Sequence, residues 1–282
     1  MKEIYFDQIK DNVSKAIFNA CHNLNCFTMN KLKEAYANED NKLAREIINQ
    51  IIENAELAEK EAIPMCQDTG IVTCFVTVGN NVHLNCDLED AINAGVRDAY
   101  DRYYLRKSVA DPLTRVNTKD NTPAIVHVKL VEGDDFIIRI APKGGGSENM
   151  SVQKMLNPTD GKEGIIKLVT QAVKEAGGRP CPPLFIGIGI GGNFEKSALM
   201  AKEALFESSR SSNPEIAALE NIIKDEVNKL DVGPMGLGGK TTCLDVFIKT
   251  MPCHIASLPV AINIQCHANR HEEIKLWSML QN

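Results

Sequence analysis

A proline at position 64 divides the chain into a helical part and a part rich in strands, and this division most constrains the fold. Residues 1–62 lack strong helix breakers. Apolar residues recur there at helical spacing and predict one buried stripe: Leu43, Ile47, Ile48, Ile51, Ile52 and Ala55. The residue before a proline disfavours the α-helical conformation, so we expect the helix to end before Pro64. The β-branched run at 71–78 then predicts a strand.

Signals at helix ends and further apolar runs predict the remaining elements. Asp87 with Asp90 is typical of a helix N-terminus, and Asn213 followed by Pro214 predicts another. Gly177 is expected to follow the last turn of a third helix. We expect helices at 88–103, 161–176, 194–207 and 214–230, and strands at 124–131, 136–141, 184–190, 244–249 and 258–264.

These elements predict a mixed α/β (α+β) fold. We expect a single domain, in which a helical N-terminal region (1–62) precedes a mixed sheet with surrounding helices (63–282). The strands at 124–131 and 136–141 are expected to form a hairpin around residues 132–135.

Composition excludes several classes of protein. The chain has 282 residues, 44% of them hydrophobic, and a net charge of −6 with both signs interspersed, so no nucleic-acid footprint is present. No apolar run approaches the roughly 18 residues that span a bilayer. The nine cysteines are an odd number without a signal peptide, which predicts reduced thiols rather than a disulfide framework. We therefore expect a cytoplasmic protein with no membrane segment.

Two glycine-rich stretches leave a nucleotide-binding interpretation open. Residues 187–192 match G-x-G-x-x-G after a predicted strand, but glycines in apolar strands also occur where two backbones approach closely. Residues 233–242 resemble a phosphate-binding loop that is out of register by one position, with Pro234 in place of the first glycine. A carboxylate-binding loop around Lys240, or a tight structural turn, is the alternative.

Three of the cysteines stand in polar loops shaped by glycine or proline. Cys66 precedes Gln-Asp-Thr-Gly, Cys181 lies between prolines, and Cys266 precedes His267. The other cysteines lie in segments where filling of the core is the default. Three such thiols suit a metal cluster, although no local C-x-x-C spacing supports one.

Six motifs in order resemble a known family. They are Met-Cys-Gln-Asp-Thr-Gly at 65–70, Tyr-Leu-Arg-Lys-Ser at 104–108, Lys-Gly-Gly-Gly-Ser at 143–147, Cys-Pro-Pro at 181–183 with Gly-Ile-Gly-Ile-Gly-Gly at 187–192, Gly-Leu-Gly-Gly-Lys-Thr-Thr at 236–242, and Pro-Val-Ala-Ile-Asn-Ile-Gln-Cys-His-Ala-Asn-Arg-His at 259–271. Together they resemble the α subunit, or N-terminal domain, of class I iron–sulfur hydro-lyases, which include class I fumarases and L-tartrate dehydratase.

This resemblance implies a cofactor and a set of site residues. It implies a [4Fe–4S] cluster on Cys66, Cys181 and Cys266, with one iron open to substrate. The residues that would contact substrate are Gln67, Asp68, Arg106, Gly144, Gly145 and His254. Gln67, Asp68 and His254 are the catalytic candidates, Arg106 would clamp a carboxylate, and the two glycines would offer backbone donors. Arg106 could instead be a helix-end cation and His254 a core histidine.

The resemblance also implies partners and a substrate class. Because the sequence ends soon after the third cysteine motif, we expect a separate β subunit to complete the site, and a symmetric dimer of αβ pairs. The expected reaction is reversible hydration of fumarate to L-malate, with L-tartrate dehydration second and mesaconate hydration third. A nucleotide-binding oxidoreductase and a non-catalytic metal protein are the alternatives of a different class.

Overall fold

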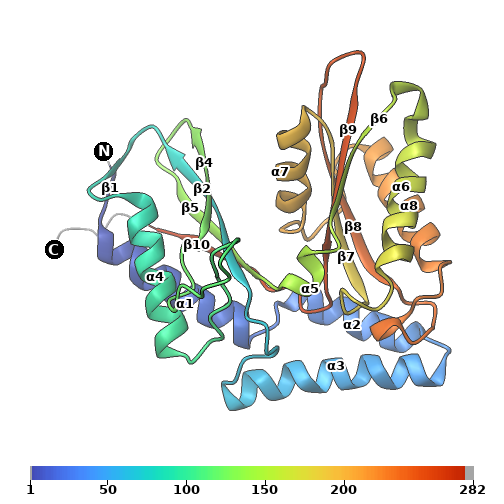
Figure 1. Ribbon diagram of the computed structural model, residues 1–282, viewed down its shortest axis with the longest axis horizontal. Coiled ribbons are helices and arrows are strands. Elements are labelled where there is room, and N and C mark those ends of the chain that lie inside the picture. The colour runs from blue at the N-terminus through green and yellow to red at the C-terminus, as the bar shows by residue number, and fades with distance from the viewer. Residues whose placement is uncertain (1, 277–282) are drawn as a thin grey trace. The chain divides into compact units, whose positions relative to one another are not determined.

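The computed structural model describes residues 2–276, and these form two compact units (Figure 1). Unit 1 contains residues 2–25, 55–145 and 270–276. Unit 2 contains residues 26–54 and 146–269. Helices and mixed sheets occur in both, which confirms the α+β class. The prediction of a single domain stays a prediction, because two compact units can still fold together as one domain.

Unit 1 is a four-stranded sheet covered by two long helices. The strands run in the order β10-β5-β2-β4, and a separate parallel pair joins β1 to β3. Its elements are β1 (Lys2–Ile4), α1 (Phe6–His22), β2 (Ile71–Gly79), β3 (Val82–Leu84), α4 (Leu88–Arg102), β4 (Ile125–Val131), β5 (Phe136–Lys143) and β10 (Glu272–Lys275). The apolar faces of α1 and α4 bury residues such as Ile9, Val13 and Ile92 against the sheet.

The predicted hairpin of strands 124–131 and 136–141 is wrong. β4 and β5 are formed, but β2 lies between them, parallel to β4 and antiparallel to β5. β2 is buried along most of its length, which explains why its run of β-branched and apolar residues is continuous rather than alternating. The short turn at 132–135 therefore connects two strands that share a neighbour.

Unit 2 is a second four-stranded sheet with helices on both faces. The strand order is β6-β9-β7-β8, and Figure 1 shows α7 on one face and α6 with α8 on the other. Its elements are α2 (Cys26–Asn38), β6 (Val152–Leu156), the 3-10 turn η1 (Pro158–Asp160), α6 (Gly161–Ala176), β7 (Leu184–Gly191), α7 (Phe194–Ala204), α8 (Pro214–Asn228), the 3-10 turn η2 (Pro234–Gly236), β8 (Cys243–Met251) and β9 (Leu258–Gln265).

Two helices extend across the boundary between the units in the sequence. They are α3 (Lys42–Glu61) and the short α5 (Gly145–Glu148). In α3, Ile48, Ile51 and Ile52 are buried as predicted, whereas Leu43 is exposed. Among residues 2–276, none of the helices has both the length and the apolar character needed to cross a membrane.

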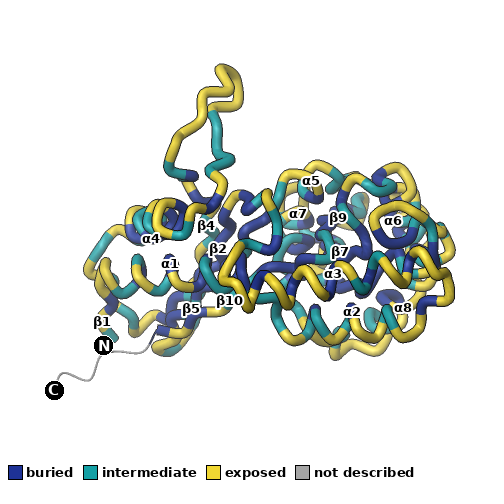
Figure 2. Tube along the Cα trace, turned by 90° about the horizontal axis from the view of Figure 1, so that it is seen from below, coloured by how far each residue is buried: buried dark blue, intermediate teal, exposed yellow. Residues whose placement is uncertain are grey.

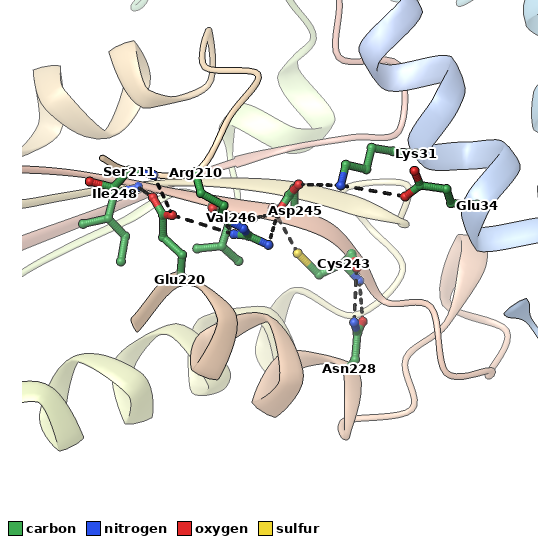
Figure 3. Close-up of polar contacts among 10 residues, drawn as sticks. All are labelled: Lys31, Glu34, Arg210, Ser211, Glu220, Asn228, Cys243, Asp245, Val246 and Ile248. Atoms are coloured by element: carbon green, nitrogen blue, oxygen red, sulfur yellow. Dashed lines mark hydrogen bonds and ion pairs between the residues drawn. The ribbon is translucent and has the colours of Figure 1, made fainter. Parts of the chain in front are cut away.

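Buried charges fix strand β8 in unit 2 (Figure 3). Asp245 is almost fully buried and forms ion pairs with Lys31, at 3.1 Å, and with Arg210. Glu220, also buried, accepts the backbone N–H of Ile248 at 2.9 Å. Each buried carboxylate therefore has a cation or backbone donors against it, as a buried charge requires.

Candidate active-site loops

The carboxylate of Asp68 is held by backbone donors on both of its oxygens. Oδ1 accepts the N–H of Gly70 at 3.0 Å, and Oδ2 accepts the N–H of Gly145 at 2.8 Å. Asp68 is half-buried in the loop between α3 and β2. A carboxylate bonded in this way has a fixed direction and stays a hydrogen-bond acceptor.

Two glycines allow this loop to lie directly against the end of β5. Gly70 has a φ of +77°, and a Cβ there would lie 2.4 Å from the backbone carbonyl of Lys143. A Cβ on Gly144 would lie 2.9 Å from Oδ2 of Asp68 and 3.6 Å from Nη2 of the buried Arg270. The glycines are thus needed for the close approach of backbone to carboxylate, as well as for turn geometry.

The loop is joined to helix α4 and to the segment that carries Arg106. The buried phenol of Tyr100 donates to the carbonyls of Thr69 at 2.7 Å and Gly70 at 2.9 Å. Burial raises the pKa of Tyr100, so the phenol remains a donor. The hydroxyl of Thr69 donates to the carbonyl of Arg106 at 3.0 Å.

Arg106 presents its side chain to solvent. Within residues 2–276, its guanidinium makes no hydrogen bond or ion pair, and only its carbonyl is bonded, to Thr69 and Ser108. An exposed guanidinium that is not neutralised by the protein is suited to bidentate binding of a carboxylate. Gln67 is likewise exposed.

Cys181 and Cys266 lie at the same end of the unit 2 sheet. Cys181 precedes β7 and Cys266 follows β9, and in the antiparallel pair Phe185 lies opposite Gln265. The backbone N–H of His267 donates to the carbonyl of Cys181, and the ring Nδ1 lies 3.0 Å from the same oxygen. The structure therefore brings these two cysteine loops together within unit 2, while Cys66 belongs to unit 1.

The chemistry of the thiols separates cluster candidates from core residues. Cys66, Cys181 and Cys266 are half-buried. By contrast, burial raises the pKa of Cys74 and of Cys243 to about 12. Because the thiolate is the metal ligand, accessible loop thiols fit an iron–sulfur cluster and buried ones do not.

Burial of Cys21 also raises its pKa, to about 11. The prediction that the remaining cysteines fill the core is wrong for Cys26 and Cys253, which are exposed, whereas Cys86 is half-buried. Among the described residues, no group of three His, Cys, Asp or Glu side chains is arranged around a single metal ion.

His254 lies far from the two unit 2 cysteines. It follows β8 in the turn to β9, at the end of the sheet opposite Cys181 and Cys266. Strands of this length separate the two ends by roughly 25 Å. His254 is exposed and its Nδ1 accepts the N–H of Ala256 at 3.1 Å, so the alternative of a core histidine is wrong. Within one chain, unit 2 does not bring His254 to these thiols.

The predicted backbone donors are in part already occupied. The N–H of Gly145 donates to Asp68, so it is not available to a substrate unless that bond breaks. The role of Gly145 as a donor to substrate stays a prediction, and it requires this bond to break. Gly144 has no side chain to crowd the Asp68 carboxylate, and its role as a backbone donor also stays a prediction.

Two of the glycines at 187–192 allow close packing of a helix on the strand. A Cβ on Gly187 would lie 2.1 Å from the carbonyl of Ala201, and one on Gly189 would lie 2.0 Å from that of Ser197. Both carbonyls belong to α7, which packs directly on β7. Gly187 and Gly189 lie inside the strand rather than in a strand-to-helix turn, so this motif does not have the dinucleotide-binding geometry.

The loop at 233–242 binds a carboxylate of the chain itself. Glu39, at the end of α2 and nearly fully buried, accepts the N–H of Thr241 at 3.0 Å and its hydroxyl at 2.8 Å. The N–H of Lys240 lies 3.4 Å from the other carboxylate oxygen. In the structure these donors serve to hold the loop against α2, and binding of an external carboxylate by this loop stays a prediction.

Comparison with known proteins identifies the family. The family model described as fumarate hydratase (fumerase) matches residues 10–275. The chain belongs to the class I hydro-lyase α-subunit family. A Methanocaldococcus jannaschii protein, provisionally named L(+)-tartrate dehydratase subunit alpha, is 43% identical over 262 residues, covering 89% of this chain and 92% of the relative. The L(+)-tartrate dehydratase α subunit of Escherichia coli (strain UTI89) is 30% identical over 258 residues, covering 89% and 85%.

This hydro-lyase family membership confirms the resemblance that the six motifs carry, and it confirms that the chain is an enzyme of the hydro-lyase class. It does not confirm fumarate as the substrate, because the relatives named here are tartrate dehydratase α subunits. The roles of individual site residues stay predictions.

Some residues around Asp68 were missed by motif reasoning. Tyr100 lies on the buried face of a helix, where an aromatic residue indicates only a core position. Its hydroxyl contacts the Asp68 loop from thirty residues away, and no local sequence pattern marks such a bond. The buried Arg270 lies beside Gly144 within unit 1.

Proposed function

We propose that this chain is the α subunit of a two-chain [4Fe–4S] hydro-lyase acting on a small dicarboxylate. Cys66, Cys181 and Cys266 would hold the cluster. When bound, the cluster would supply an iron with an open coordination position, a Lewis acid that assists departure of hydroxide from a 2-hydroxy acid. The expected cytoplasmic location and the symmetric dimer of αβ pairs are part of this proposal.

The observation that carries the proposal is that the fixed carboxylate of Asp68 and the exposed, unneutralised guanidinium of Arg106 belong to two segments that are bonded to each other. The loop of Asp68 and the segment of Arg106 are joined by the bond from the Thr69 hydroxyl to the Arg106 carbonyl. A dicarboxylate that loses water needs an anchor for a carboxylate and an acceptor near the reacting hydroxyl. Arg106 and Asp68 have these two chemistries.

The chain's own residues then act by binding and by holding protons. Arg106 would bind one substrate carboxylate through two parallel N–H donors. Asp68, with its direction set by Gly70 and Gly145, would accept a hydrogen bond from the substrate hydroxyl or hold the transferred proton. The exposed amide of Gln67 would add a donor beside it.

Two substrates are the main candidates. The names of the relatives favour L(+)-tartrate dehydration, and the description of the family favours reversible hydration of fumarate. Mesaconate remains a third. The candidates differ by a hydroxyl or a methyl group, and a site that pairs with a hydroxyl can discriminate strongly against a substrate that lacks it.

A β subunit is expected because the relatives are named α subunits. The test is anaerobic assay of the chain alone and after co-expression with its β subunit, against L-malate, L(+)-tartrate and mesaconate. We expect turnover only from the pair, with one preferred substrate. Full turnover by this chain alone would contradict the two-chain proposal.

Iron and acid-labile sulfide content tests the cluster ligands. We expect about four of each per αβ pair, lost in Cys66→Ser, Cys181→Ser and Cys266→Ser. Cys243→Ser is the matched control, because that thiol is buried and donates to the carbonyl of Asp245 at 3.2 Å. Equal cluster content in all four variants would refute the ligand assignment.

A further inference from the structure

The side chain of Asn121 joins the two loops on which the proposed dicarboxylate site depends. Its Nδ2 donates to the carbonyl of Gly70 at 3.1 Å. Its Oδ1 accepts the N–H of Ser108 at 2.7 Å and that of Val109 at 3.2 Å. Asn121 is 0% exposed, so both ends of the amide are used where water cannot replace them.

The backbone at this position explains why the residue is an asparagine. Asn121 has a φ of +61°, in the left-handed region that asparagine tolerates better than other residues with side chains. Aspartate could accept the two N–H groups but could not donate to Gly70. Glycine could adopt the backbone conformation but could make neither contact. The conformation and both ends of the amide together favour asparagine.

Asn121 also sits at the foot of a protruding loop. Residues 111–119 between α4 and β4 are exposed, and Figure 2 shows this segment standing out from the unit. The loop is closed above Asn121 by backbone bonds from Thr118 to Val109 and from Asp111 to Val116. Arg106 lies at the start of this loop, two residues before Ser108. Without the amide of Asn121, the bond from the Thr69 hydroxyl to the Arg106 carbonyl would still join the start of the loop to the Asp68 loop.

We propose that Asn121 is a positioning residue that fixes the guanidinium of Arg106 relative to the carboxylate of Asp68. The inference rests on the proposed function, since it assigns Arg106 to a substrate carboxylate. Asn121 does not touch substrate. It acts through Ser108 and Val109 on one side and through Gly70 on the other.

The experiment is a pair of double-mutant cycles on the anaerobic αβ enzyme, with L-malate or L(+)-tartrate as substrate, whichever the parent dehydrates. We expect Asn121→Gly to raise KM about tenfold with a smaller change in kcat, because ground-state binding by Arg106 weakens. Asn121→Gly and Arg106→Ala should be non-additive in KM, since both remove the same interaction. Asn121→Asp, which keeps the acceptor and loses the bond to Gly70, should also raise KM.

Tyr100→Phe is the matched control. It removes the hydroxyl that donates to the carbonyls of Thr69 and Gly70, but it leaves the N–H groups of Ser108 and Val109 bonded to Asn121. Its effect should therefore be additive with Arg106→Ala. Amide hydrogen exchange in a peptide covering Arg106 to Val109 supplies a readout that does not depend on turnover. It should become faster in Asn121→Gly and stay close to the parent in Tyr100→Phe.

The outcomes separate the two levels of the proposal. If Arg106→Ala raises KM but neither Asn121 variant does, the positioning role is overturned and the proposed function stands. Additive effects of Asn121→Gly and Arg106→Ala would also overturn it. If Arg106→Ala leaves KM unchanged, the assignment of Arg106 to a carboxylate fails, and the inference about Asn121 fails with it.

Discussion

Replacing Gly144 with alanine tests whether the direction of the Asp68 carboxylate controls the reaction. The new Cβ would lie 2.9 Å from Oδ2 and 3.3 Å from Cγ, whereas ordinary contact begins at 3.4 Å. The carboxylate must therefore retreat by about 0.5 Å, which lengthens or bends its 2.8 Å bond from Gly145. Displacements of this size at a reacting group cost about 10- to 100-fold in rate.

The fold should tolerate the same substitution. Gly144 does not have a positive φ, and the crowded atoms belong to the end of a half-exposed side chain. Weakening one charge-assisted hydrogen bond destabilises the protein, and replacing glycine with alanine restricts the unfolded chain, which partly offsets it. We expect a net loss of at most about 2 kcal/mol in the free energy of unfolding.

The assay is anaerobic steady-state turnover of the αβ enzyme, together with thermal unfolding of each variant. Gly146→Ala is the matched control, because a Cβ there meets only the carbonyl of Arg179, at an ordinary 3.5 Å. We expect Gly144→Ala to lose most of kcat and Gly146→Ala to keep it within about threefold. Parent kcat in a folded Gly144→Ala variant would refute the reasoning. An equal loss in both variants would show that the effect does not come from Asp68.

Three further predictions concern stability and its pH dependence. Asp245→Ala should cost about 1.5–3 kcal/mol in urea unfolding, because Lys31 and Arg210 lose this buried partner but keep their ion pairs with Glu34 and Glu220; a loss below about 1 kcal/mol would contradict this. Glu39→Ala should cost about 1–3 kcal/mol by the same measurement, since the loop N–H groups that it accepts lose their acceptor. Burial lowers the pKa of His22 below 6.5, so the unfolded chain binds the proton first and stability should fall as the pH drops below about 6.5. This component should be absent from urea titrations of His22→Gln, and an identical pH dependence in that variant would exclude it.

Helix ends were predictable because their signals are local. Asp87 accepts the N–H of Asp90, and Asn213 accepts from the first turn of α8, as the sequence indicates. Gly177 follows α6 with a φ of +55°. Each of these residues either accepts a backbone N–H a few positions away or adopts a backbone conformation that its own type favours. A short stretch of sequence therefore includes both partners.

The order of the strands was not predictable in the same way. β4 and β5 have the alternation and spacing of a hairpin, yet both pair with β2, which occurs about fifty residues earlier in the sequence. The strand β10 was missed because Glu272–Lys275 is short and mostly polar, and it is a strand only by pairing with the edge of β5. Pairing partners depend on tertiary packing, which no short window of sequence describes.

Residues of the candidate site are of two kinds: some have hydrogen-bonding groups that are still available, and others already use theirs within the chain. Motif reasoning found Gln67, Arg106 and Gly145 but not Asn121, and it did not show which of their groups the chain already uses. The side chains of Gln67 and Arg106 are exposed. By contrast, the N–H of Gly145 and the side-chain amide of Asn121 donate hydrogen bonds within the chain. A substrate can bind only to groups whose capacity remains, so the exposed pair should decide affinity. The groups bonded within the chain should decide geometry. Gly144→Ala displaces the reacting carboxylate of Asp68 and should lower kcat, whereas Asn121→Gly releases the segment of Arg106 and should raise KM.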